Sequence, residues 1–166
     1  MSKIREEEEK RTSPQIFYSG GIECYALLEL KREHSNRSAL NKKGGDLLDY
    51  YLLGRSIELF LKAFLRGNGM NLDRLRKKIS HNLEKAFRKS QTFGLSELVS
   101  IEEKEIAALK ILNHQYSKKR LEYSMVGMYT LPEFPLIFGV AEKLKNNLKS
   151  FSAEKTKEFR KNNPLG

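Results

Sequence analysis

One segment constrains the fold more than any other part of this chain. From Asp46 to Gly67 the sequence DLLDYYLLGRSIELFLKAFLRG places apolar side chains three and four residues apart, the period of an α-helix with a buried face. Further apolar residues flank that face. We therefore predict a helix over 46–66 that is buried on more than half of its circumference, with Asp46 as its cap and Gly67 and Gly69 at its end.

Weaker amphipathic patterns predict four further helices, which begin near residues 21, 80, 100 and 130 and end near residues 34, 91, 116 and 151. The first has an apolar stripe that Gly20 and Gly21 interrupt. This stripe consists of Phe17, Cys24, Leu27, Leu28 and Leu30. Ser80 is predicted to cap the second helix, whose apolar side consists of Ile79, Leu83, Ala86 and Phe87.

The starts of the last two helices have the spacing of capping boxes. Ser100 precedes Glu103, and Thr130 precedes Glu133, by three residues each. Pro132 or Pro135 suits the first turn of the final helix, because its missing N–H is not needed there.

The segments outside the helices complete the expected organisation. We expect a frayed or disordered tail over 1–12, a single bundle over 13–152 and a charged tail over 153–166. The composition of 35–45 predicts a loop, and 123–129 is a weak strand candidate. The expected fold class is all-α, a single up-down bundle of about five helices, which suits a chain of 166 residues.

Composition excludes several classes of protein. One cysteine rules out an intrachain disulfide framework, and the three histidines show no metal-ligand spacing, so we predict no metal and no cofactor. No stretch approaches the roughly 18 continuous apolar residues of a membrane span, and no secretory signal is visible. We therefore expect a cytoplasmic protein that does not enter a membrane.

The positive charge is uneven along the chain. Residues 1–50 hold 9 basic and 9 acidic residues, whereas residues 51–166 hold 22 basic and 12 acidic ones, which accounts for the whole net charge of +10. Such a balance permits binding to nucleic acid. Two basic runs are the candidate phosphate contacts: Arg74, Arg76, Lys77 and Lys78, and then Lys118, Lys119 and Arg120. The alternative is that 74–78 is a solvated connector and that the basic residues of 118–120 sit favourably at a helix C-terminus.

Two short motifs resemble those of HEPN-domain proteins. The segment Glu58-Leu-Phe-Leu-Lys-Ala63 matches a helix of the form E-x-x-L-K-A, and a glycine-rich break then leads to His81-Asn82-Leu83. Leu112-Asn113-x-x-Tyr116 is similar to an L-N-x-x-Y stretch of some members. The resemblance covers about residues 20–150. It implies a helical bundle, a homodimer, and a place in toxin–antitoxin, defence or stress systems, for some members beside a nucleotidyltransferase-like partner.

The resemblance leaves the activity open between three functions. Some HEPN proteins are metal-independent ribonucleases with an Arg-x4–6-His motif, whereas others bind RNA, nucleotides or protein partners without catalysis. Arg76-x4-His81 has the right spacing, but the family motif lies at a later helix, where this chain has Lys110 and His114. We expect a non-catalytic binding module first, a ribonuclease acting across a homodimer second, and a structural dimer or assembly protein third.

Four residues are the catalytic candidates: His81, Arg76, Glu58 and His114. His81 is predicted either as a general acid/base or RNA contact, or as a helix-start residue whose ring bonds Glu58. Glu58 either forms surface ion pairs with Arg55 and Lys62 or points inward and orients His81. In a ribonuclease, Arg76 or Arg120 would stabilise the charge that develops on phosphorus. Asn113 and Tyr116, beside His114, either contact RNA or cap and fill the core.

Overall fold

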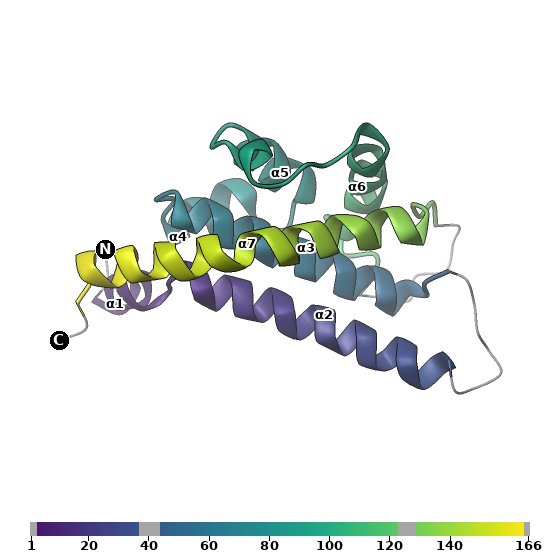
Figure 1. Ribbon diagram of the computed structural model, residues 1–166, viewed down its shortest axis with the longest axis horizontal. Helices are drawn as coiled ribbons and strands as arrows, with labels where there is room; N and C mark the ends of the chain where they lie inside the picture. Colours follow the sequence, from purple (N-terminus) through teal and green to yellow (C-terminus); the bar gives the residue numbers. More distant parts are fainter. Residues whose placement is uncertain (1–2, 37–43, 123–128, 165–166) are drawn as a thin grey trace.

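The computed structural model describes residues 3–36, 44–122 and 129–164, and over these residues the chain is all-helical, without a strand (Figure 1). The elements are α1 (Lys3–Arg11), α2 (Pro14–Asn36), α3 (Leu47–Gly67), α4 (Leu72–Arg74), a π turn (Leu75–Ile79), α5 (Leu83–Gln91), a 3-10 turn (Leu95–Glu97), α6 (Glu103–Tyr116) and α7 (Phe134–Asn162). The all-α class is confirmed. The described residues hold seven α-helices rather than five, because α1 and the short α4 are additional.

The three long helices α2, α3 and α7 form the body of the molecule. At one end of α3, the ring of Tyr50 packs against Phe134 at the start of α7, and at the other end Phe64 packs against Phe151. The helices α3 and α7 therefore run in the same direction. The Ser56 hydroxyl of α3 donates a 3.0 Å hydrogen bond to the Gly21 carbonyl of α2, which runs the opposite way (Figure 1). The bundle thus departs from the simple up-down order.

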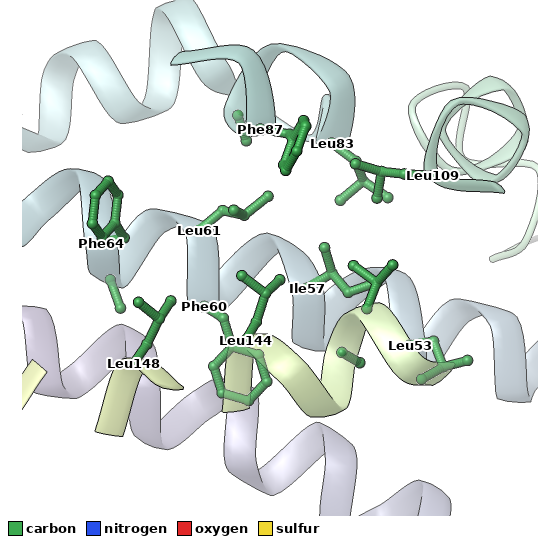
Figure 2. Close-up of a cluster of buried hydrophobic side chains, with 14 of the residues drawn as sticks. Leu53, Ile57, Phe60, Leu61, Phe64, Leu83, Phe87, Leu109, Leu144 and Leu148 are labelled. Carbon is green, nitrogen blue, oxygen red and sulfur yellow. The ribbon is translucent and has the colours of Figure 1, made fainter. Parts of the chain in front are cut away.

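The helices α5 and α6 cover α3 on the side away from α2, and α6 is seen nearly end-on in Figure 1, so it crosses the long helices. Side chains of α3 fill the space between these layers, with α5 and α6 on one side and α7 on the other (Figure 2). The fully buried apolar ones are Leu53, Ile57, Phe60, Leu61, Ala63 and Leu65. Burial on more than half of the circumference of α3 is therefore confirmed, and so is its Asp46 cap, whose side chain accepts from the Asp49 N–H.

The helix α2 is longer than expected and passes through Gly20 and Gly21 without a break. A Cβ on Gly21 would lie 2.6 Å from the Phe60 ring, so this glycine permits close packing of α2 on α3 and does not mark a helix end. Within the predicted stripe of α2, Leu28 is buried whereas Leu27 and Leu30 are exposed.

Three predicted caps are wrong. Asn82, not Ser80, caps α5, because its side chain accepts from the Lys85 N–H at 2.8 Å. The N-cap of α6 is Glu102, two residues after the predicted Ser100. The Glu105 carboxylate accepts from the Glu102 N–H at 2.8 Å.

The final helix also begins late, since Glu133 precedes its first residue and makes no side-chain cap. Thr130 therefore does not cap it, although Pro135 lies in its first turn as predicted and Pro132 lies before it.

The described residues near both ends of the chain are helical. Residues 3–11 form α1, where we expected a frayed or disordered tail, and residues 153–162 belong to α7, where we expected a charged tail. The helix α1 is anchored by Glu9, whose carboxylate pairs with buried Arg66 and accepts from the Leu72 N–H at 2.9 Å. The helix α7 continues beyond 153, and the Thr156 hydroxyl there accepts a 2.9 Å hydrogen bond from the Gln15 N–H. Of the predicted loop, 37–43 lie outside the described residues, as do 123–128 of the strand candidate.

Candidate functional site

A buried carboxylate in the middle of α3 organises the candidate site. Glu58 is 0 % exposed, and each of its oxygens bonds two side chains. Oε1 lies 2.5 Å from the Lys62 amine and 3.2 Å from the Arg55 guanidinium. Oε2 accepts from the Tyr116 hydroxyl at 2.5 Å and lies 3.2 Å from His81 Nδ1. The inward position of Glu58 and its contact with His81 are thus confirmed.

The charges of this cluster hold Glu58 ionised. Burial by itself would raise the pKa of its carboxyl, but Lys62, Tyr116 and Arg55 together outweigh burial, and the pKa is lowered. Burial and the neighbouring carboxylate raise the pKa of the Tyr116 phenol, so that Tyr116 is a hydrogen-bond donor to Glu58 at neutral pH. A buried ion with four partners satisfies the requirement that buried charges be paired.

Two residues let Tyr116 of α6 reach Glu58 of α3. A Cβ on Gly54 would lie 2.6 Å from the Tyr116 ring, so only glycine permits this approach without movement. Buried Asn113 accepts a 2.8 Å hydrogen bond from the Leu83 N–H at the start of α5 and thereby ties α6 to α5. Tyr116 therefore fills the core, and Asn113 accepts from the backbone N–H at the start of α5. Both side chains are buried, so neither is placed to contact a base.

The π turn (Leu75–Ile79) places His81 beside Glu58. This turn closes with a 2.9 Å hydrogen bond from the Ser80 N–H to the Leu75 carbonyl. Ser80 then adopts a φ of +52°, a conformation that residues other than glycine rarely take. The next side chain, His81, is 47 % exposed, so it touches the buried carboxylate while still reaching solvent.

Above this cluster lies a pocket of about 350 Å³, which we call the basic pocket. Its polar and charged lining residues are Arg55, Lys62, Arg76, His81, Ser80, Thr12 and Glu8. Glu8 of α1 forms an ion pair with Arg76 across it. Glu8 is an acidic lining residue, and Glu58 lies behind the lining in contact with Arg55, Lys62 and His81. Arg55, Lys62 and Arg76 outnumber these two carboxylates, so the charged side chains leave an excess of positive charge. Such a site suits an anion with several oxygens, such as a phosphate.

Only some of the site residues predicted from the sequence lie at the basic pocket. Arg76 and His81 both line the basic pocket, and Glu58 lies behind its lining, in contact with His81. His114 is exposed on α6 and lies outside the pocket. The remaining basic candidates also lie outside it: Arg74, Lys77, Lys78, Lys118, Lys119 and Arg120. Among them Lys77 pairs with Asp73 at 3.0 Å.

Sequence reasoning did not anticipate two features of the site, the hydrogen bond from Tyr116 to Glu58 and the place of Glu8 in the pocket lining. Tyr116 lies 58 residues from Glu58, and Glu8 lies 68 residues from Arg76. The only local signal was Gly54, a glycine inside an otherwise strong helical pattern, which often marks a close approach by another group.

Over residues 3–36, 44–122 and 129–164, no group of three or more histidine, cysteine, aspartate or glutamate side chains is placed to hold a metal ion. No helix in the same part of the chain has the length and apolar character needed to cross a membrane.

No protein-family model, curated protein or solved structure matches the chain.

Proposed function

We propose that this chain is a HEPN-like binding protein that takes a phosphate group of RNA or of a nucleotide into the basic pocket, without cleaving it. The observation that carries the proposal is the convergence of Arg55, Arg76 and His81 on one pocket above an ionised, fully bonded Glu58. Basic side chains alone are common on surfaces. A pocket in which Arg55 and His81 are held against a buried carboxylate is a more specific feature.

The cationic side chains differ in what they can offer a ligand. Lys62 is nearly buried and contacts Glu58 at 2.5 Å, so its charge serves mainly the network. Arg55 is 35 % exposed and keeps part of its guanidinium fork for an incoming anion. Arg76 is more exposed still but pairs with Glu8, so a phosphate would compete with that carboxylate.

A second candidate, a metal-independent ribonuclease, is favoured by one contact. If His81 Nδ1 donates its proton to Glu58, then Nε2 carries the free electron pair and can take or return a proton. Arg76, in the same pocket, would stabilise negative charge on a phosphorane. Glu58 would then be a positioning residue that fixes the tautomer of His81.

A homodimer remains part of the proposal. Three exposed apolar side chains on α2 support it: Ile16, Leu27 and Leu30. Light scattering on the purified chain tests it, and a monomer at all concentrations would contradict it.

One experiment tests the two candidate functions together. A labelled pool of single-stranded RNA is incubated with the wild type, Arg55→Gln, His81→Asn and the control His114→Asn, with EDTA present. We expect salt-dependent binding without cleavage, weakened about tenfold by Arg55→Gln and unchanged by His114→Asn. Cleavage that His81→Asn abolishes and His114→Asn retains would favour the ribonuclease. A wild type that neither binds nor cleaves would refute both.

A further inference from the structure

The π turn also contributes to a second hollow, of about 440 Å³, which we call the α5 hollow. It is lined by Met70, Lys78, Ile79, Lys85, Arg88, Lys89 and Thr92. Among the residues that the structure describes, no acidic side chain lines it. Met70 and Ile79 form an apolar floor, and four basic side chains surround them.

The rim of this hollow is one face of α5. Lys85, Arg88, Lys89 and Thr92 follow the i, i+3, i+4, i+7 spacing that places side chains on one side of a helix. All four are exposed. The opposite face of α5 is packed into the core, because Ala86, Phe87 and Ser90 are buried. The basic face is therefore fixed in orientation by the burial of the other side.

The basic pocket and the α5 hollow share the π turn as a common wall. Leu75 and Arg76 line the basic pocket, whereas Lys78 and Ile79, two and three residues further on, line the α5 hollow. Single π turns inside helices are frequent at functional sites. A ligand with one phosphate could occupy one hollow only. A flexible polymer with a phosphate at every unit could occupy both.

We propose that a single-stranded RNA segment of several nucleotides passes from the basic pocket over the π turn into the α5 hollow. There Lys78, Lys85 and Lys89 contact successive phosphates, and one base covers the apolar floor. Exposed Phe93, with the Lys89 amine 4.9 Å above its ring, adds an aromatic surface beside this path. This inference rests on the proposed function and specifies its ligand.

The size of the floor favours a strand of RNA over an acidic protein helix. An amphipathic helix inserts several apolar anchors, spaced over two turns, into a hydrophobic groove. The α5 hollow offers two apolar side chains, Met70 and Ile79, which is enough for one base. Its basic rim matches repeated phosphates without needing a particular sequence.

The test uses the full chain and measures the binding of uridine monophosphate and of a uridine 12-mer by fluorescence and calorimetry. The variant K85Q/R88Q/K89Q removes charge from the α5 hollow. The control K149Q/K157Q/K161Q removes the same charge from exposed positions on α7 that line neither hollow. Arg55→Gln reports on the basic pocket. Circular dichroism confirms that every variant is folded, which is expected because the substituted side chains of both triple variants are exposed.

We expect K85Q/R88Q/K89Q to weaken binding of the 12-mer at least about tenfold and to lower its salt dependence by about two ion equivalents, with binding of the monophosphate unchanged. Equal loss in the α7 control would overturn the inference while leaving the proposed function in place. So would displacement of the 12-mer by a poly-glutamate peptide as effectively as by unlabelled RNA. Failure of the wild type to bind either ligand would overturn the inference and the proposed function together.

Discussion

Two acidic residues of α3 are both buried, and they serve different purposes. Asp49, in the first turn, accepts from the Asp46 N–H at 3.2 Å and pairs with Lys31 at 2.6 Å. It satisfies a backbone group that the helix start leaves without a partner. Glu58 lies in the middle of the helix, where no backbone group needs it. Its four partners are side chains, three of which, Arg55, Lys62 and His81, line a pocket. A buried carboxylate at a helix start has a structural role, because it bonds the backbone there. A buried carboxylate in the middle of a helix can instead position the side chains of a functional site.

The largest expected effect is on stability. Glu58→Ala leaves Lys62 and Tyr116 buried without their acceptor, so we expect it to lower the free energy of unfolding by about 3–5 kcal/mol. Asp49→Ala removes the N3 half of the capping box at a helix end, where the partly exposed Lys31 can turn to water, and we expect a loss of about 1–2 kcal/mol. Urea denaturation followed by circular dichroism measures both. Equal losses would show that the two carboxylates do not differ in this way.

The close contact between Gly54 and Tyr116 offers a way to disturb the network around Glu58 without substituting a charged residue. A Cβ at this position would lie 2.6 Å from the Tyr116 ring, so we expect Gly54→Ala to cost about 1–3 kcal/mol. The control is Gly20→Ala, whose Cβ would meet only the end of the Leu59 side chain at 3.3 Å. There the helical preference of alanine acts alone, and we expect a gain of up to about 1 kcal/mol. A destabilising Gly20→Ala would mean that helix packing, not Tyr116, explains the first result.

The pH dependence of stability tests the charge of Glu58 directly. Its pKa in the folded protein is lower than the ordinary 4.5, so ionised Glu58 stabilises the fold above that pH, and this contribution disappears as pH falls through the lowered value. We therefore expect the wild type to be more stable than Glu58→Gln at neutral pH, and the difference to shrink below about pH 4.5. Urea midpoints over the acidic range measure it. A difference that does not change with pH would contradict the ionised state.

The smallest expected effect concerns the rim of the basic pocket. Glu8 pairs with Arg76, and both side chains are largely exposed, so we expect Glu8→Gln to leave the melting temperature nearly unchanged. Freeing Arg76 should strengthen binding of RNA by about two- to fivefold, because a competing carboxylate is removed. Glu7→Gln is the matched control, since Glu7 pairs with Arg11 within α1. An equal gain in both variants would indicate a general effect of charge.

The residues that sequence reasoning placed correctly share a local cause. The periodicity of α3 predicted its burial, and the side chain of Asp46 was recognisable as a cap because capping involves neighbours in the chain. The contact between Glu58 and His81, which is not local, was one of two alternatives that the sequence left open for these residues. The cap at Ser80 was wrong because the π turn shifts the start of α5 by two residues, and no propensity scale predicts such a turn.

The amino-acid sequence by itself determined the helices and their apolar faces, because helical periodicity and most capping act between residues a few positions apart. Only the tertiary structure decided which polar groups meet. The parallel course of α3 and α7, the approach of Tyr116 over Gly54 and the pairing of Glu8 with Arg76 join segments far apart in the chain. Contacts of that kind depend on how whole helices pack, and they leave no periodic signal in the sequence.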